Sequence, residues 1–302
     1  MTGPSDNPKR GTGFDRVLSF TIPESNARGR VVRLGPVLDT VLSAHDYPQP
    51  IRHLLAEALV LTALLGSLLK EGGSQLTLQA QSDEGIVDLL VCDFRDAEVR
   101  GYVRFDAERL AEVGGNSSLE KLFGEGYLAI TFDLPATDER YQGIVPLEGA
   151  SLSEVCEAYF EKSEQVPTVI RLGIRGGSGS MVAGGLLVQY FPEGEEGQVR
   201  LHVQADHPEW EHIAVLSSSI RHDELVDADL ELEQLVWRLF HQEGQVRVLP
   251  MAKLTRGCRC TLEYYQNVLS KFPEAERAEM RDADGTIPVD CAFCSKIFMV
   301  PA

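Results

Sequence analysis

The chain has 302 residues, with 46 acidic and 28 basic side chains, a net charge of −18 and 43% hydrophobic residues. At roughly 150 residues per domain, this length suggests about two domains, each able to bury a core, which excludes disorder of the whole chain. Proteins that bind nucleic acids normally carry a basic face, so the acidic charge argues against DNA or RNA as the main partner.

Residues 1–13 are polar and contain Pro and Gly, and no apolar segment follows the basic pair Lys9-Arg10. We therefore expect a disordered tail and no secretion signal. The longest apolar stretch, Leu54 to Leu69, is interrupted by Glu57 and is shorter than the roughly 18 apolar residues of a membrane helix, so no transmembrane segment is predicted. The expected compartment is the reducing cytoplasm, where cysteines serve as metal ligands or redox groups more often than as structural disulfides.

Residues 14–203 are predicted to form an N-terminal core, because strand-like and helix-like patterns alternate there without a long polar break. The short connections Asp83-Glu84-Gly85 and Asp93–Glu98 can join neighbouring strands as hairpins, which favours a mixed, largely antiparallel sheet with packed helices. The predicted class is therefore α+β. The predicted strands are Gly29–Leu34, Leu76–Gln81, Ile86–Phe94, Val99–Phe105, Tyr127–Leu134, Gln142–Leu147, Val169–Ile174 and Leu186–Phe191.

Two helices are indicated in this core. The run from Leu54 to Leu69 is apolar over most of its circumference and follows Pro48 and Pro50, which predicts a buried helix. Ser151-Leu152-Ser153-Glu154 has the capping-box pattern, in which a hydroxyl and a carboxylate accept from free amides at a helix start.

Residues 204–256 are predicted to be a helical linker. Between Asp206 and Glu243 the sequence is acidic, and one apolar stripe is formed by Leu232, Leu235, Val236, Leu239 and Phe240. Such a stripe must be buried on another surface. The linker is therefore either an ordinary amphipathic cover of the core or a mobile segment, and the sequence leaves both interpretations open.

Residues 257–302 contain four of the six cysteines, as Cys258-Arg259-Cys260 and, after 30 intervening residues, Cys291-Ala292-Phe293-Cys294. A segment this short rarely folds by hydrophobic burial alone. Two closely spaced cysteine pairs separated by a folding segment are typical of a tetrahedral zinc site, so we predict one structural zinc ion bound by Cys258, Cys260, Cys291 and Cys294. Nearby cations, Arg256, Arg259 and Lys296, can offset the charge of four thiolates.

This zinc site can be static, or it can act as a switch, because zinc-bound thiolates can be oxidised to disulfides that no longer bind metal. The other cysteines, Cys92 and Cys156, are predicted to be buried small apolar residues. No phosphate-binding G-x-x-x-x-G-K-[ST] loop or other enzyme signature is found, so an enzyme is not expected. Three classes of function remain: an oxidation-dependent binding protein, a static zinc-binding interaction module, and a hydrolase or oxidoreductase that turns over a small substrate.

Together with the cysteine pairs, several upstream motifs resemble those of the redox-regulated heat-shock protein 33 chaperones, from about residue 14 to the end. These motifs are His45-Asp46-Tyr47-Pro48-Gln49-Pro50, Arg140-Tyr141-Gln142-Gly143, Tyr159-Phe160, Ser163-Glu164-Gln165, Pro167-Thr168, Ala183-Gly184-Gly185 and Trp237-Arg238-Leu239.

The resemblance implies an ATP-independent holdase of the bacterial cytoplasm that is inactive while reduced and zinc-bound. It implies disulfides Cys258–Cys260 and Cys291–Cys294 in the oxidised form, loss of zinc and loosening of the linker. It also implies binding of unfolded or oxidatively damaged client proteins, dimerisation on activation, and transfer of clients to foldase chaperones. No client-binding residues are assigned.

Overall fold

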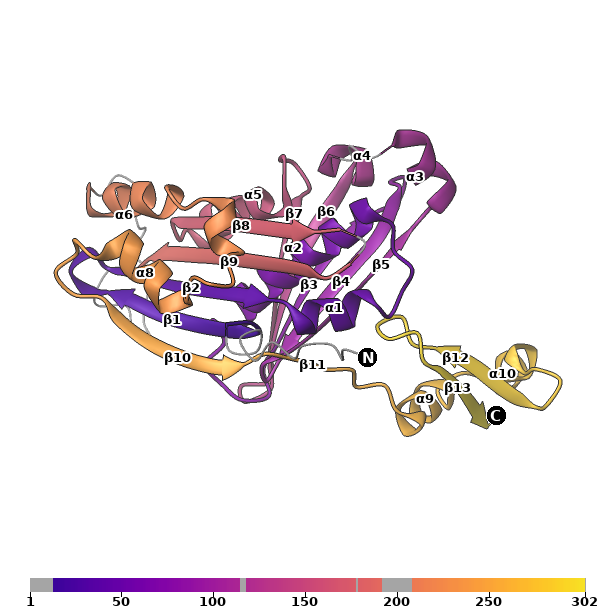
Figure 1. The fold of residues 1–302 in the computed structure, drawn as a ribbon. Coiled ribbons are helices and arrows are strands. Elements are labelled where there is room, and N and C mark those ends of the chain that lie inside the picture. Colours follow the sequence, from indigo (N-terminus) through magenta and orange to yellow (C-terminus); the bar gives the residue numbers. More distant parts are fainter. Residues whose placement is uncertain (1–12, 115–117, 178, 192–207, 302) are drawn as a thin grey trace, which may run out of the picture.

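Two large β-sheets and a C-terminal hairpin organise the chain, of which the computed structural model describes residues 13–114, 118–177, 179–191 and 208–301 (Figure 1). The five-stranded sheet has the order β10-β1-β2-β9-β8, with bounds Arg247–Lys253, Arg16–Ile22, Ala27–Leu34, Met181–Tyr190 and Thr168–Gly176. The six-stranded sheet has the order β11-β5-β4-β3-β6-β7, with bounds Thr255–Arg256, Glu98–Phe105, Val87–Arg95, Gln75–Ser82, Gly126–Leu134 and Glu139–Pro146. The hairpin consists of β12 (Thr286–Asp290) and β13 (Ile297–Pro301).

The strand pairs in these sheets are antiparallel, apart from the short parallel pair of β11 and β5. The hairpin between β4 and β5 turns through Asp96 and Ala97, both in the left-handed region with φ of 50° and 63°, as a tight two-residue hairpin turn requires. Each predicted strand overlaps an observed one, and the predicted α+β class is confirmed. The division of the strands between two sheets was not predicted.

The helices lie between and around the sheets. Their bounds are α1 (Pro36–Leu42), α2 (Gln49–Gly66), α3 (Ala107–Val113), α4 (Leu119–Phe123), α5 (Leu152–Tyr159), α6 (Pro208–Ser218), α7 (His222–Leu225), α8 (Leu232–Phe240), α9 (Leu262–Leu269) and α10 (Glu274–Met280), with helical turns at Pro23–Ser25 and Phe160–Glu164.

Helix α2 lies between the two sheets, and this position explains why its sequence is apolar on nearly every side. It contacts β3, β4 and β5 of one sheet and β2, β8 and β9 of the other. Its side chains are almost all buried from Leu54 to Leu65, so the prediction of a buried helix is confirmed. Proline at its start supplies a preset backbone angle where no amide donor is needed, and the helix begins at Gln49.

Helix α5 begins at the predicted cap, but the capping box is changed. The Ser151 hydroxyl accepts from the Glu154 amide at 3.3 Å, as predicted. The Glu154 carboxylate accepts from the amide of Ala150 at 2.8 Å, one residue before the cap. A carboxylate of α2, Glu57, accepts from the Ser153 amide at 3.2 Å, so the helix start is also tied to the core.

The acidic helices α6, α7 and α8 cover the face of the five-stranded sheet opposite α2 (Figure 1). Of the predicted stripe, Leu232, Leu235, Val236 and Phe240 are buried in one cluster with side chains of β1, β2, β8 and β9, and Leu239 packs at its margin. These helices therefore form an amphipathic cover of the core, which is the first of the two interpretations that the sequence left open.

Residues 247–256 were predicted as part of a helical linker, and this is wrong, because they form β10 and β11. Strand β10 is recruited by pairing with β1, and its Pro250 lies on an edge strand, where a missing amide donor is tolerated. The predicted tail at residues 1–13, except for Gly13, and the predicted boundary at 203/204 lie outside the described residues.

Candidate metal centre

The four C-terminal cysteines come from two short turns of one small lobe, which comprises residues 257–301 and projects from the core (Figure 1). Cys258 and Cys260 lie between β11 and α9, whose start is capped by the Thr261 hydroxyl accepting from the Tyr264 amide. Cys291 follows β12, and Cys294 lies in the turn before β13. That turn is closed by hydrogen bonds from the amides of Cys294 and Ser295 to the carbonyl oxygen of Cys291, at 3.1 and 2.8 Å.

The four sulfur atoms converge on one point. The Sγ–Sγ distances are 3.2 Å between Cys258 and Cys260, 3.6 Å between Cys258 and Cys291, and 3.4 Å between Cys260 and Cys294. All four lie within 4.8 Å of one another, and this is the only such group of His, Cys, Asp or Glu found among the described residues. All are free thiols, as a disulfide bond would require about 2.05 Å.

This arrangement can hold a metal ion. A tetrahedral ion with metal–sulfur bonds of about 2.3 Å places its sulfur ligands about 3.8 Å apart, close to the observed separations. Four protein ligands leave no open coordination position for a substrate, which is the pattern of a structural site. The predicted set Cys258, Cys260, Cys291 and Cys294 is thus brought together as a group.

The protonation of these thiols shows why a cation suits them. Although burial raises the pKa of Cys291, the Tyr265 hydroxyl and the Phe293 amide donate to its sulfur, and together with neighbouring thiols they lower that pKa to about 7. Burial and the adjacent sulfurs instead raise the pKa of Cys260. The pKa of Cys294 is also raised, first by burial. Burial thus disfavours the thiolate forms of Cys260 and Cys294, and a cation bound among the sulfurs would favour them.

The lobe has almost no apolar core besides the cysteines. Its buried side chains are Ile287, Cys291, Phe298 and Val300, and the other cysteines pack beside them with partly buried apolar residues such as Tyr265 and Leu269. Neither α9 nor α10 has a buried residue. Since so little apolar surface is buried, a metal ion holding the sulfurs together would supply most of the stability of this lobe.

The lobe is docked on the six-stranded sheet through the turn that carries its second cysteine pair. The Phe293 ring meets Tyr102 edge to face at a centroid distance of 4.9 Å and lies 3.9 Å from the guanidinium carbon of Arg100. Arg100 is held in turn by the buried Asp93 at 2.6 Å. Nearby, His45 Nδ1 lies 3.0 Å from the Ser295 hydroxyl. This contact between Phe293 and the sheet could not be predicted from the sequence, which carries no signal for it beyond an aromatic residue in the turn.

The chain connects this docked lobe directly to the linker. Gly257, just before the first cysteine, donates its amide to the Val99 carbonyl of β5 at 3.1 Å. Strand β11 precedes it on the same β5 edge, and β10 and α8 come before that. Fewer than 20 residues of chain therefore separate the end of α8 from the first cysteine of the lobe.

The other residues singled out in the sequence, two cations and two cysteines, have structural contacts of their own. Arg259 donates to the Gln75 side chain of β3 at 2.5 Å, and Lys296 lies 4.8 Å from the Phe298 ring centroid. Both cations lie beside the cysteines in sequence but have partners of their own. Cys92 and Cys156 are fully buried, as predicted, and burial raises the pKa of each thiol.

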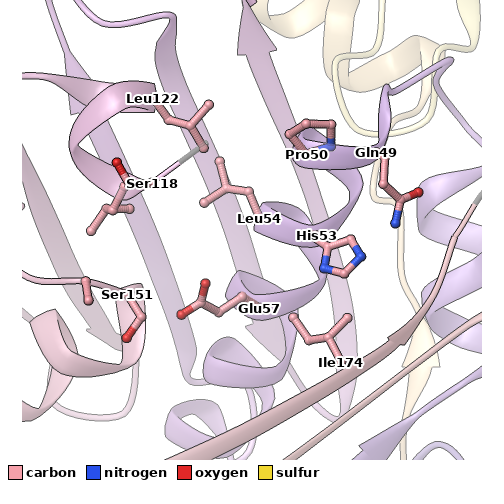
Figure 2. A pocket seen from close by; sticks show the side chains of 11 residues that line it. Gln49, Pro50, His53, Leu54, Glu57, Ser118, Leu122, Ser151 and Ile174 are labelled. Atoms are coloured by element: carbon pink, nitrogen blue, oxygen red, sulfur yellow. The ribbon is translucent and has the colours of Figure 1, made fainter. Parts of the chain in front are cut away.

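A second polar site, away from the cysteines, was missed by the sequence analysis. A pocket of about 420 Å³ lies between α2, α4 and the start of α5, with Glu57 pointing toward Ser151 (Figure 2). Burial raises the pKa of Glu57 to about 7, against a smaller effect of the Ser153 and Leu152 amides. Glu57 belongs to the helix cap described above, so its observed role is structural.

The chain thus has an α+β core with acidic helices across one sheet and a small C-terminal lobe in which four thiols converge. These features define a class of proteins whose C-terminal four-cysteine lobe can hold a metal ion. Within this class, the chain belongs to the Hsp33 family, since the family model described as "Hsp33 protein" matches residues 15–300.

Individual relatives agree with this assignment. A "33 kDa chaperonin" of Caulobacter vibrioides is 40% identical over 299 residues, which cover 96% of each chain. A "33 kDa chaperonin" of Escherichia coli is 33% identical over 290 residues, covering 95% of this chain and 92% of the relative. The crystal structure of the "33 kDa chaperonin (Heat shock protein 33 homolog)" from Thermotoga maritima has the same fold, with a TM-score of 0.76, 24% identity and 95% coverage of both chains.

These names denote a chaperonin and not a class of enzyme. Across the described ranges, no helix has the length and apolar character needed to span a membrane.

Proposed function

We propose that this protein is a redox-regulated, ATP-independent holdase that binds unfolding proteins after oxidation of its cysteine centre. The observation that carries the proposal is the convergence of four free thiols in a lobe with few buried apolar side chains. Such a lobe depends on its thiolates for its fold. Chemistry at the thiolates then changes the conformation of a whole module.

The proposed resident metal is one zinc ion in the reduced form, held by Cys258, Cys260, Cys291 and Cys294. When bound, zinc supplies a dication that stabilises four thiolates at once and has no redox chemistry of its own. A soft, all-sulfur ligand set favours it over magnesium or calcium, which prefer oxygen ligands.

The proposed switch is the oxidation of the two cysteine pairs by a peroxide. With hydrogen peroxide as the oxidant, two thiolates of each pair lose two electrons and form one S–S bond, while the O–O bond is broken and, with two protons from solvent, gives two waters. Pairing within each turn gives Cys258–Cys260 and Cys291–Cys294, which matches the family resemblance. Disulfide sulfurs no longer ligate the ion, so the lobe loses the interaction that holds its two turns together.

Loss of the lobe fold would be transmitted to the linker. The turn that carries Phe293 would leave Tyr102 and Arg100, and β11 and β10 would lose an anchored neighbour. Helix α8 covers apolar side chains of β1 and β2, including Phe20, whose ring centroid lies 5.4 Å from that of Phe240. Release of α8 would therefore expose apolar surface on both the sheet and the helix, which is the surface an unfolded client protein can bury.

Several finer properties are proposed with this function. The clients would be unfolded or oxidatively damaged proteins of the cytoplasm, and the activated form would be a homodimer that passes clients to foldase chaperones. The net charge of −18 would keep the open form and its complexes in solution. No nucleic acid or membrane is proposed as a partner.

The proposal is tested by following zinc content, free thiols and the aggregation of a thermally unfolding client together, while the protein is treated with peroxide and then with dithiothreitol. The expected result is that zinc release, loss of four thiols and suppression of aggregation rise together and reverse together. If zinc leaves without any gain in suppression, the chain is instead a static zinc-binding interaction module. If zinc stays bound throughout, the switch itself is wrong.

A further inference from the structure

A row of cationic and glycine residues crosses the face of the five-stranded sheet beneath the linker. The strand registers place Lys253 opposite Arg16, Arg16 opposite Arg33, Arg33 opposite Gly184, and Gly184 opposite Gly173. Residues directly opposite on adjacent strands project from the same face, so these five form one row, which we call the basic–glycine row. Linker residues 222–233 lie along it.

Arg33 is the centre of this row and is completely buried by the linker. Its Nε, Nη1 and Nη2 atoms donate to the carbonyl oxygens of Leu225, Leu230 and Glu224, at 2.9, 2.8 and 3.3 Å. On β8, which is separated from β2 by β9, Arg175 donates to the Val226 carbonyl at 2.8 Å. All four acceptors belong to the main chain of the linker.

The two glycines allow the linker backbone to approach this closely. A Cβ atom at Gly184 would lie 2.2 Å from the Leu225 carbonyl oxygen, and one at Gly173 would lie 2.3 Å from that of His222. Both contacts are with backbone, which cannot move aside as a flexible side chain can. Only glycine therefore permits the linker main chain to rest on the sheet at these positions.

The side chains that the linker adds to these contacts are acidic. Arg16 donates to Glu233 at 2.8 Å and lies 3.6 Å from Glu231. Asp227 and Glu231 also act electrostatically on Arg33. The row thus recognises carbonyl oxygens and carboxylates in a segment of backbone. Neither feature is specific to one sequence.

Departure of the linker would leave Arg33 without its three acceptors, beside an open strip of backbone and further cations. The Arg33 guanidinium is positioned to donate to carbonyl oxygens, and the glycines beside it leave room for a main chain. An unfolded polypeptide exposes its backbone carbonyl oxygens, so it is complementary to this strip. In the closed protein, the linker occupies the site that such a polypeptide would bind.

We propose that the basic–glycine row is a main-chain docking site. It holds residues 222–233 closed in the reduced protein, and, if the holdase function proposed above is correct, it accepts an acidic unfolded segment of a client once the linker leaves.

The docking of the linker is tested in the reduced, zinc-bound protein, without any oxidation. Hydrogen exchange of the amides in residues 222–230 is compared for wild type, Arg33→Met and Gly184→Ala. Loss of even one charge-assisted hydrogen bond is worth about tenfold in an equilibrium, and the methyl group added at Gly184 would displace the Leu225 carbonyl that accepts from Arg33. Exchange should therefore rise about tenfold or more in both variants. The matched control is Arg104→Met, an exposed arginine paired with Asp88 on the other sheet, which should leave this exchange unchanged.

The two variants keep the test decisive, because one removes a cation and the other only adds a methyl group. Zinc content and the exchange of β3 and β4 report whether the core stays folded. Unchanged exchange of residues 222–230 in either variant that retains a protected core would overturn the docking site.

The second half is tested with a fluorescein-labelled peptide of residues 220–233 added to the protein after peroxide treatment. Fluorescence anisotropy should show binding to the opened wild type, about tenfold weaker binding to Arg33→Met, and comparable binding of a peptide with the same residues in scrambled order. No binding, equal binding by Arg33→Met, or strict dependence on the peptide sequence would each contradict main-chain recognition. If peroxide fails to release zinc or to raise exchange in the linker, the proposed function fails, while the measurement on the reduced protein still decides the docking site.

Discussion

Replacing Phe293 by alanine should detach the cysteine lobe from the core without disturbing the cysteines. The substitution removes one edge-to-face contact with Tyr102, worth about 0.5–1.5 kcal/mol, and one cation–π contact with Arg100, worth about 0.5–2 kcal/mol. Taking about 2 kcal/mol for the pair, the ratio of docked to undocked lobe should fall about 30-fold.

The assay is hydrogen exchange of residues 255–257, which pair with β5 directly before the first cysteine of the lobe. In the reduced, zinc-bound protein, exchange of these amides should rise about 10- to 30-fold in Phe293→Ala, since local opening sets the rate. The matched control is Phe272→Ala, because Phe272 lies on the same lobe and is 39% exposed. Unchanged exchange at residues 255–257, with zinc retained in both variants, would refute the view that Phe293 anchors the lobe.

Three further predictions concern the metal, the linker and the core. Cys258→Ser should reduce bound zinc from one ion per chain to nearly none by atomic absorption, whereas Cys156→Ser, at a buried cysteine of the core, should retain it. Phe240→Ala should lower the free energy of unfolding, measured in urea, by about 3–5 kcal/mol, because a fully buried ring is lost. The control is Trp237→Ala on the same helix: this side chain is 65% exposed, so the free energy of unfolding should change by about 0.5 kcal/mol or less. Burial raises the folded-state pKa of Glu57 from 4.5 to about 7, so the folded protein holds this proton more tightly than the unfolded chain does. The stability of the protein should therefore fall as pH rises from about 4.5 to 7. Glu57→Gln should remove this pH dependence and raise the thermal midpoint above pH 7.

The sequence was informative wherever the relevant forces are local. Alternating apolar residues predicted strands such as Leu76–Gln81, and the apolar run around Leu54–Leu65 predicted a buried helix, since both patterns reflect which faces of an element are covered. Cysteine spacing likewise predicted which four side chains would meet, because each pair is held by its own turn.

The sequence was uninformative wherever a distant partner decides the structure. Strand β10 was predicted as part of a helical linker, and its conformation depends on pairing with β1, more than 200 residues earlier. The cap of α5 receives Glu57 from α2, and Phe293 finds Arg100 only in the folded chain. Patterns in the sequence cannot reveal such contacts, because the spacing of nearby residues does not depend on them.

The central claim is that four thiolates and their metal hold the lobe, and that the lobe holds the linker closed. The most direct test is hydrogen exchange of residues 232–240 in fully reduced protein, before and after a chelator removes the zinc, so that metal loss is separated from oxidation. We predict that exchange in this segment rises sharply, while β3 and β4 remain protected. Complete removal of zinc with no change in exchange at residues 232–240 would contradict the account.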